Sequence, residues 1–182
     1  MDIISSLATL SFDKRRSAYF TGELLTLLSL IDKKVVTKDI LFGSWAGALG
    51  NFQFMPSTID KYGIDYDQDN KIDLKYSLND SIASAANYLN KAGWKYNNFC
   101  FTEVNFTKKI DKSYFNHSAR NIKKKNNLEF WKKIGISGFK NTKNIENIKK
   151  FDLVLPDGDE SSPKYLVSEN YEKVLKWNRS LR

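Results

Sequence analysis

Three aspartates near the middle of the chain have the residue type and the spacing of a calcium-binding loop. Asp65, Asp67 and Asp69 stand at alternate positions, which directs their carboxylates into one concavity, as at positions 1, 3 and 5 of an EF-hand loop. Hard oxygen ligands in a flexible loop suit Ca²⁺ better than a transition metal. Lys71, at position 7, would contribute its backbone carbonyl. The segment therefore predicts a calcium site.

Two positions decide how far the comparison with an EF-hand holds. Position 6, usually glycine, is Asn70, and asparagine tolerates the left-handed backbone that the turn requires. Position 12, usually glutamate, is Tyr76, so the later carboxylate of Asp80 would have to complete the ligand set. Ser77 and Asp80 also fit an S-x-x-D capping box for the following helix, and Asp/Asn-rich turns are common without metal. Both interpretations stay open, because a capping aspartate can also be a ligand.

The preceding segment, "GSWAGALGNFQFMPSTIDKYG" (43–63), combines glycines with aromatic rings and uncharged hydrogen-bonding side chains. Sugars present C–H faces that stack on rings and hydroxyls that need hydrogen bonds. The glycines would let the backbone approach a ligand or another helix, so ordinary packing is the alternative. The candidate rings are Trp45, Phe52 and Phe54, and the candidate polar groups are Ser44, Asn51 and Gln53.

Helical periodicity and helix-end signals surround these two loops. They predict helices over 3–12, 16–34, 56–63 and 77–94. The last of these would carry one stripe formed by Ile82, Ala85, Ala86 and Leu89. Further along, the residue pattern predicts a strand within 96–106, two strands around a turn at 156–158, and a final helix over 169–178.

Composition narrows the classes of partner. The 182 residues carry a net charge of +8, which favours anionic partners, but residues 107–150 have few rings among their lysines, so no nucleic acid is expected. Cys100 and His117 are the only cysteine and histidine, which argues against an internal disulfide and against Ser-His-Asp catalysis. No apolar run approaches the ~20 residues that span a bilayer, so no transmembrane segment is expected.

The long stretch "GSWAGALGNFQFMPSTIDKYGIDYDQDNKIDL…SIASAANYLNKAGW" resembles the membrane-bound lytic murein transglycosylase B family. The flanking stretches "SLATLSFDKRR…YFTGEL" and "LPDG…SPKYLVSENYEKVLKWNRS" resemble the same family. The resemblance implies an α+β, mainly α fold with a lysozyme-like helical lobe, a calcium-type loop (65–80) and a groove. Because the composition changes after Trp94, we expect the helical lobe to comprise 1–94, followed by a small Lys- and Asn-rich mixed α/β insert (95–150) and a return segment that completes the groove (151–182). It also implies that Asp80 is the late calcium ligand and that the partner is the glycan strand of peptidoglycan.

Four residues match the family's groove. Ser44 and Gln53 match residues that contact the sugar, and Tyr88 matches a groove aromatic. Asn178 matches an asparagine near the reacting sugar. The resemblance therefore implies a substrate-binding set from both ends of the chain.

The family cleaves the β-1,4 bond between N-acetylmuramic acid and N-acetylglucosamine with one glutamic acid, which forms a 1,6-anhydro product. That glutamate lies in a Glu-Thr motif upstream of "SLATLSF". We therefore expect no catalytic residue in this chain, which resembles a family member truncated at both ends. We expect activity only if the missing N-terminal glutamate complements it, either because the start is misassigned or because the gene is split and a separate N-terminal fragment supplies the acid. The alternative is a catalytically silent peptidoglycan-binding or calcium-binding remnant of a split gene. The family is periplasmic or envelope-associated, whereas the start of this sequence lacks a signal-peptide pattern and predicts a cytoplasmic chain as written.

Overall fold

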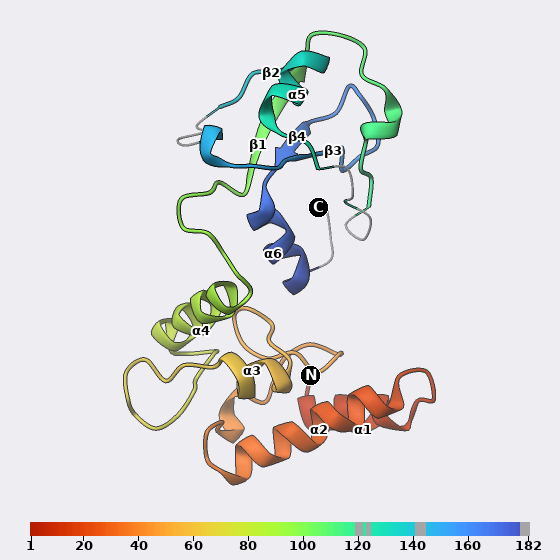
Figure 1. The fold of residues 1–182 in the computed structure, drawn as a ribbon. Coiled ribbons are helices and arrows are strands. Elements are labelled where there is room, and N and C mark those ends of the chain that lie inside the picture. Colours follow the sequence, from red (N-terminus) through yellow and green to blue (C-terminus); the bar gives the residue numbers. More distant parts are fainter. Residues whose placement is uncertain (119–121, 123–124, 141–144, 179–182) are drawn as a thin grey trace. The chain divides into compact units, whose positions relative to one another are not determined.

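The computed structural model describes residues 1–118, 122, 125–140 and 145–178. The chain folds into two compact units, Met1–Tyr88 and Leu89–Arg182 (Figure 1). Parts of the Lys- and Asn-rich segment, 119–121, 123–124 and 141–144, and the end of the chain, 179–182, lie outside the described residues. The predicted division of the chain at residues 94 and 150 stays a prediction.

The first unit is helical. Its helices are α1 (Ile3–Phe12), α2 (Ser17–Asp32), α3 (Pro56–Tyr62) and the greater part of α4 (Leu78–Lys91), with a short 3-10 turn η1 (Lys38–Ile40). Asp2 caps α1 by accepting a hydrogen bond from the N–H of Ser5 at 2.7 Å, and Pro56 opens α3. The four helices predicted for this part of the chain are confirmed. Its core includes Ile3, Leu7, Leu27, Leu30, Leu49, Phe54 and Ile59.

The predicted stripe of α4 is wrong. Ile82 is 53% exposed, whereas Asp80, Ser81 and Ser84 are buried. Short polar side chains occupy the inner face because they hydrogen-bond to the loop backbone that lies against it. The hydroxyl of Ser81 donates to the carbonyl of Leu74 at 2.8 Å, and that of Ser84 accepts from the N–H of Ile64 at 2.9 Å.

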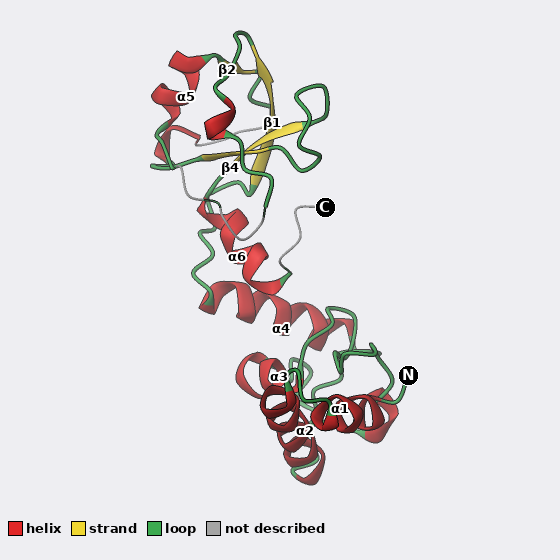
Figure 2. Ribbon diagram, turned by 90° about the vertical axis from the view of Figure 1, so that its right-hand side faces the viewer, coloured by secondary structure: helices red, strands yellow, loops and turns green. Residues whose placement is uncertain are grey.

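The second unit is built on a four-stranded antiparallel sheet with the order β2-β1-β4-β3 (Figure 2). Predicted strands at 96–106 and around the turn at 156–158 are confirmed, as is the final helix, so the expected α+β class holds. Helix α5 was not predicted. The elements are β1 (Phe101–Phe106), η2 (Lys112–Tyr114), α5 (Leu128–Ile134), β2 (Ile136–Ser137), η3 (Ile145–Asn147), β3 (Asp152–Val154), β4 (Lys164–Val167) and α6 (Glu169–Trp177).

The two faces of this sheet differ in what they bury. One face carries Val104, Leu153 and Leu166, which belong to a core cluster that also contains Trp131 and Phe151. The indole N–H of Trp131 donates to the carbonyl of Phe151 at 3.2 Å, so the largest buried ring is also hydrogen-bonded. Alternate residues of the same strands point to the opposite face.

Across the described part of the chain, the structure contains no helix with both the length and the apolar character needed to cross a bilayer.

Candidate functional site

The acidic loop brings three carboxylates together. One oxygen from each of Asp65, Asp67 and Asp80 lies within 4.8 Å of the other two. Asp80, at the start of α4, is buried, Asp65 is half-buried and Asp67 is exposed. Desolvation raises the pKa of Asp67, and the neighbouring carboxylates of Asp80 and Asp69 raise it further. Crowding of this kind is relieved by a cation.

Backbone N–H groups hold the two inner carboxylates in place. The Asp80 oxygens accept from the N–H groups of Tyr66 and Asp73, both at 2.9 Å. The two carboxylate oxygens of Asp65 accept from the N–H groups of Asp69, at 3.2 Å, and Asn70, at 2.8 Å. These bonds fix the loop around the carboxylates.

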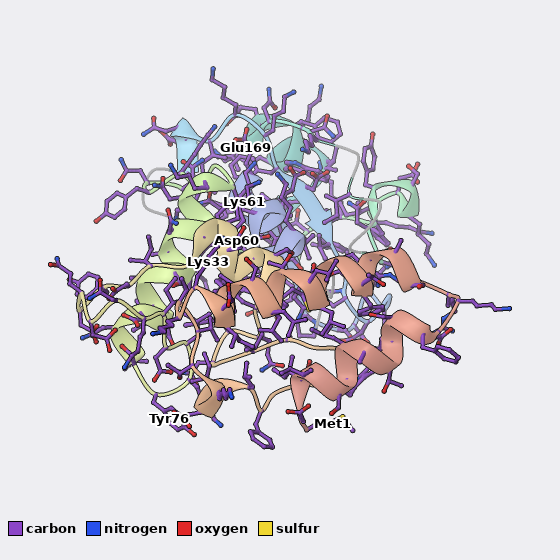
Figure 3. All side chains as sticks on the ribbon, turned by 90° about the horizontal axis from the view of Figure 1, so that it is seen from below. Met1, Lys33, Asp60, Lys61, Tyr76 and Glu169 are labelled. Carbon is purple, nitrogen blue, oxygen red and sulfur yellow. The ribbon has the colours of Figure 1, made fainter. Side chains whose placement is uncertain are left out.

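The turn geometry follows the EF-hand comparison at position 6. Asn70 has a φ of 68°, so the left-handed backbone predicted there is confirmed, and Gln68 has a φ of 64°. Position 12, Tyr76, is 67% exposed and is labelled in Figure 3. The late carboxylate, Asp80, is the one that joins the group.

The capping interpretation of Asp80 also holds in part, because its N–H donates to the hydroxyl of Ser77 at 3.2 Å. Its carboxylate is committed to the loop instead. Three clustered carboxylate oxygens are the donor type that Ca²⁺ prefers, so the residues present fit that ion. Asp69, whose Oδ1 accepts from the N–H of Lys71 at 2.8 Å, and the carbonyl of Lys71 stay predicted ligands.

The glycine-aromatic loop closes on itself through a short bridge. Leu49 and Phe54 exchange backbone hydrogen bonds of 2.8 and 2.9 Å. Between them Gln53 has a φ of 53° and its amide donates to the carbonyl of Gly50 at 2.9 Å. The hydroxyl of Ser44 accepts from the N–H of Ala48 at 2.9 Å. Two predicted sugar contacts thus also shape the loop.

The rings of the loop divide into exposed and buried ones. Trp45 is 69% exposed and Phe52 is 39% exposed, while Phe54 is buried. Tyr88 is half-buried on α4, with its ring centroid 5.9 Å from that of Phe54 and 5.0 Å from that of Tyr62. Partial burial raises the pKa of the Tyr88 hydroxyl. Trp45 and Phe52 are therefore the more exposed rings of the loop.

Asn178 follows the last residue of α6, where its N–H donates to the carbonyl of Val174 at 3.0 Å. Its side chain is exposed. Ser44, Gln53 and Tyr88 belong to the first unit and Asn178 to the second. The sugar-contact role of each of these four residues stays a prediction.

The glycines of the loop serve packing. A side-chain carbon on Gly50 would lie 2.4 Å from the carbonyl oxygen of Leu74, and one on Gly43 would lie 2.2 Å from that of Ala48. The sequence left open whether these glycines allow contact with a ligand or close packing of the chain. In the structure, close packing explains both Gly43 and Gly50. Sequence reasoning missed the bond from the amide of Asn51 to the hydroxyl of Ser81 at 3.2 Å, which ties this loop to α4.

Gly50→Ala is expected to destabilise the protein by about 2 kcal/mol or more, because the new carbon meets backbone and the φ of 71° is strained for alanine. Gly22→Ala is the matched control. Nothing lies within 4 Å of a carbon added there, inside α2, so it is expected to stabilise by about 0.5–1 kcal/mol. Thermal unfolding followed by circular dichroism measures both. Equal effects would contradict the packing role.

Comparisons with known proteins relate the chain to a family of transglycosylases. A family model described as "Transglycosylase SLT domain" matches residues 1–182. The chain is 44% identical over 93 residues to membrane-bound lytic murein transglycosylase B of Escherichia coli (strain K12), which is 50% of this chain and 26% of that protein. The match covers about a quarter of the length of this curated relative.

Solved structures show the same fold. SltB3 from Pseudomonas aeruginosa, in complex with NAG-anhNAM-pentapeptide, matches with a TM-score of 0.85 and 32% identity, over 98% of this chain and 46% of that one. Escherichia coli Slt35, in complex with calcium, matches with a TM-score of 0.78 and 29% identity, over 99% of this chain and 55% of that one. The chain spans about half of each. The expected lysozyme-like, α+β and mainly α fold is confirmed, and the chain belongs to the lytic transglycosylase family defined by the transglycosylase SLT domain.

Proposed function

We propose that this chain forms the sugar-binding and calcium-binding part of a lytic transglycosylase that acts on peptidoglycan. The observation that carries the proposal is the match over 98% of the chain to SltB3, whose complexes contain NAG-NAM-pentapeptide and NAG-anhNAM-pentapeptide. Murein lies outside the cytoplasm, so the proposed place of action is the cell envelope.

The glycine-aromatic loop of the first unit would bind the glycan strand. The exposed rings of Trp45 and Phe52 offer stacking faces, and Ser44 and Gln53 offer uncharged hydrogen-bonding groups. Tyr88, whose ring packs against those of Phe54 and Tyr62, is the third proposed polar contact, and Asn178 of the second unit is the fourth. None of these six side chains carries a charge, which suits neutral sugar rings.

Asp65, Asp67 and Asp80 would hold Ca²⁺, together with Asp69 and the carbonyl of Lys71. The ion would supply fixed positive charge that stabilises the loop. The loop backbone then holds its place against α4 through the bonds of Asp80, Ser81 and Ser84. The proposed role of the ion is structural.

The general acid of the reaction is proposed to come from outside these 182 residues. A glutamic acid with a raised pKa would protonate the bond between N-acetylmuramic acid and N-acetylglucosamine and then accept the proton of the muramic 6-hydroxyl, closing the 1,6-anhydro ring. Glu23, the buried glutamate of the first unit, accepts two hydrogen bonds from Ser57 and is committed to the fold.

Binding and cleavage can be tested separately with purified murein sacculi. The 182-residue chain is expected to co-sediment with sacculi and to release no 1,6-anhydro-muropeptides, measured by mass spectrometry. Trp45→Ala is expected to weaken binding about 10-fold, as loss of a stacked ring does. Tyr96→Ala, which removes a 94% exposed ring from the second unit, is the control and should leave binding unchanged.

A fusion that adds the glutamate-containing segment of the Escherichia coli relative is expected to release the anhydro products. Its Glu→Gln form should lose about 10²–10⁴-fold in rate. Release by the unfused chain would show an acid within these residues. Failure of the unfused chain to bind sacculi would contradict the proposed glycan site.

A further inference from the structure

The acidic loop and the glycine-aromatic loop of the first unit are joined near the end of the acidic loop. Three consecutive residues, Asp73, Leu74 and Lys75, make the connection. The N–H of Asp73 donates to the carboxylate of Asp80 at 2.9 Å. The carbonyl of Leu74 accepts from the N–H of Asn51 at 2.8 Å. The segment is thus bonded to the carboxylate group at one residue and to the glycine-aromatic loop at the next.

The side chain of Asn51 adds two bonds to the same region. Its amide nitrogen donates to the carbonyl of Lys75 at 3.3 Å and to the hydroxyl of Ser81 at 3.2 Å. A side-chain amide carries two hydrogens, and both are used within the protein. The sequence makes Asn51 a candidate polar group for a sugar, but in the structure its amide hydrogens hold the loop in place instead.

Ser81 completes the connection from α4. Its side chain is 1% exposed, and its hydroxyl donates to the carbonyl of Leu74 at 2.8 Å while it accepts from Asn51. Ser81 directly follows Asp80, whose carboxylate belongs to the proposed calcium site. A continuous path of covalent and hydrogen bonds therefore runs from the carboxylate group through Ser81 to Asn51.

Gly50 and Gln53 extend this path to the proposed sugar contacts. A side-chain carbon on Gly50 would lie 2.4 Å from the carbonyl oxygen of Leu74, so the glycine-aromatic loop rests directly on that residue. The amide of Gln53 donates to the carbonyl of Gly50 at 2.9 Å. Phe52 lies between Asn51 and Gln53 in the sequence. A displacement of Leu74 would therefore move the part of the loop that presents Phe52 and Gln53.

We propose that Asn51 is a positioning residue through which calcium strengthens glycan binding. The inference rests on the proposed function, because it requires both the glycan site and the calcium site. Without a cation, the clustered carboxylates of the acidic loop repel one another, which favours loosening of the residues bonded to them. Calcium would hold Asp80 and, through it, Leu74 and the loop attached to Asn51. The glycan would then lose less conformational entropy on binding.

The coupling is measured on the 182-residue chain with tri-N-acetylchitotriose, a neutral β-1,4-linked oligomer of N-acetylglucosamine, as the glycan probe. Its dissociation constant, followed by the indole N–H resonances, is expected to be about 5-fold lower in calcium than in EGTA. Coupling between two ligands is reciprocal. Saturating chitotriose should therefore lower the dissociation constant of calcium, measured by calorimetry, by the same factor.

Asn51→Ala removes both amide bonds and is expected to reduce the coupling to less than about 2-fold, although calcium still binds. Ser81→Ala breaks the same path from α4 and should have the same effect. Ser84→Ala is the matched control. Ser84 is also buried on the inner face of α4, but its hydroxyl accepts from the N–H of Ile64, which precedes the acidic loop. Its loss should leave the coupling at about 5-fold, since the bond does not lead to Asn51.

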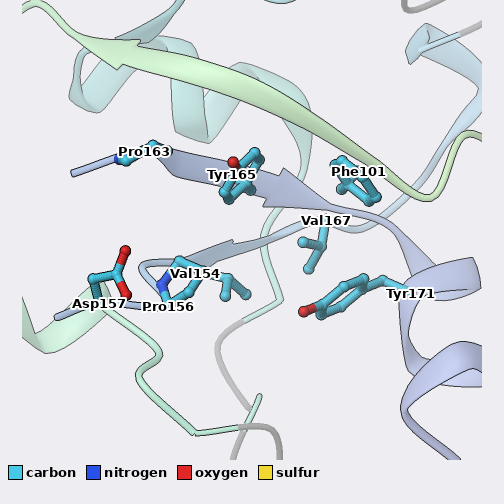
Figure 4. A pocket seen from close by; sticks show the side chains of 8 residues that line it. All are labelled: Phe101, Val154, Pro156, Asp157, Pro163, Tyr165, Val167 and Tyr171. Atoms are coloured by element: carbon cyan, nitrogen blue, oxygen red, sulfur yellow. The ribbon is translucent and has the colours of Figure 1, made fainter. Parts of the chain in front are cut away.

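The second unit contains another aromatic surface against which the probe must be checked. A cavity of about 300 Å³ is lined in part by Phe101, Tyr165 and Tyr171 (Figure 4). Phe101 is 56% exposed. Phe101→Leu removes this ring and should leave both dissociation constants and their coupling unchanged, because the proposed path lies within the first unit.

Equal dissociation constants of chitotriose in calcium and in EGTA would overturn the inference and leave the proposed function standing. The same conclusion would follow if Asn51→Ala and Ser81→Ala kept the full coupling, or if Ser84→Ala reduced it as much as they do. Absence of chitotriose binding under both conditions would contradict the proposed glycan site itself, and the inference with it.

Discussion

Asp80→Ala is expected to lower the free energy of unfolding by about 3–5 kcal/mol, because two N–H groups lose their acceptor within the protein. Both carboxylate oxygens of Asp80 accept from the loop backbone, one from Tyr66 and one from Asp73, and its side chain is 1% exposed. The loop would lose its attachment to α4. Urea unfolding followed by circular dichroism measures the change.

The same substitution is expected to abolish stabilisation by calcium. In the unsubstituted chain, Ca²⁺ at 100 times its dissociation constant should add about 2.7 kcal/mol, since it binds only the folded loop. Chelation with EGTA should reverse the gain. Asp67→Asn separates the two roles of the carboxylates: Asp67 is exposed, so its loss should remove the response to calcium at little cost to the apo protein.

Asp60→Asn serves as the control for these variants. Asp60 is exposed on α3 (Figure 3) and lies outside the carboxylate group. It should retain both the stability and the calcium response of the parent chain. A chain whose unfolding is unaffected by calcium at millimolar concentration would contradict the calcium site while leaving the hydrogen-bonding role of Asp80 intact.

The acidic loop could be predicted from the sequence because its geometry is local. The alternating aspartates, the left-handed turn at Asn70 and the late carboxylate of Asp80 all lie within one short segment, where spacing along the chain determines position in space. The strands and most helices were predictable for the same reason, since periodicity and turn residues act over a few positions.

Features that depend on distant partners could not be predicted. The inner face of α4 is polar because Ser81 and Ser84 bond to loops, and apolar periodicity alone gave the wrong stripe. Likewise, the sequence allows Gly50 either to contact a ligand or to pack against another part of the chain. Only the structure shows that Leu74 lies against it. Short side chains and glycines carry little pattern of their own, so their roles are set by what the tertiary structure places beside them.

Glu23 shows the same dependence most clearly. In the sequence it is a lone carboxylate within an apolar helix. In the structure it lies in the interior, 4% exposed, and accepts from the backbone N–H of Ser57 at 2.9 Å and from its hydroxyl at 2.7 Å. The N-cap residue of α3, Met55, provides no side-chain cap. Glu23 therefore supplies from α2 the acceptor that the start of α3 lacks.

Glu23→Ala is accordingly expected to cost about 3 kcal/mol, because it removes two hydrogen bonds to a carboxylate and leaves a cavity. The melting temperature should fall on the order of 10 °C. Ser57→Ala removes only the hydroxyl bond and should cost about 1 kcal/mol, with the double variant little worse than Glu23→Ala alone. Thr21→Ala, at an exposed position of the same helix, should stay within about 0.5 kcal/mol of the parent. Fully additive losses in the double variant would mean that the two side chains act independently, and the cap that joins α2 to α3 would have to be sought elsewhere.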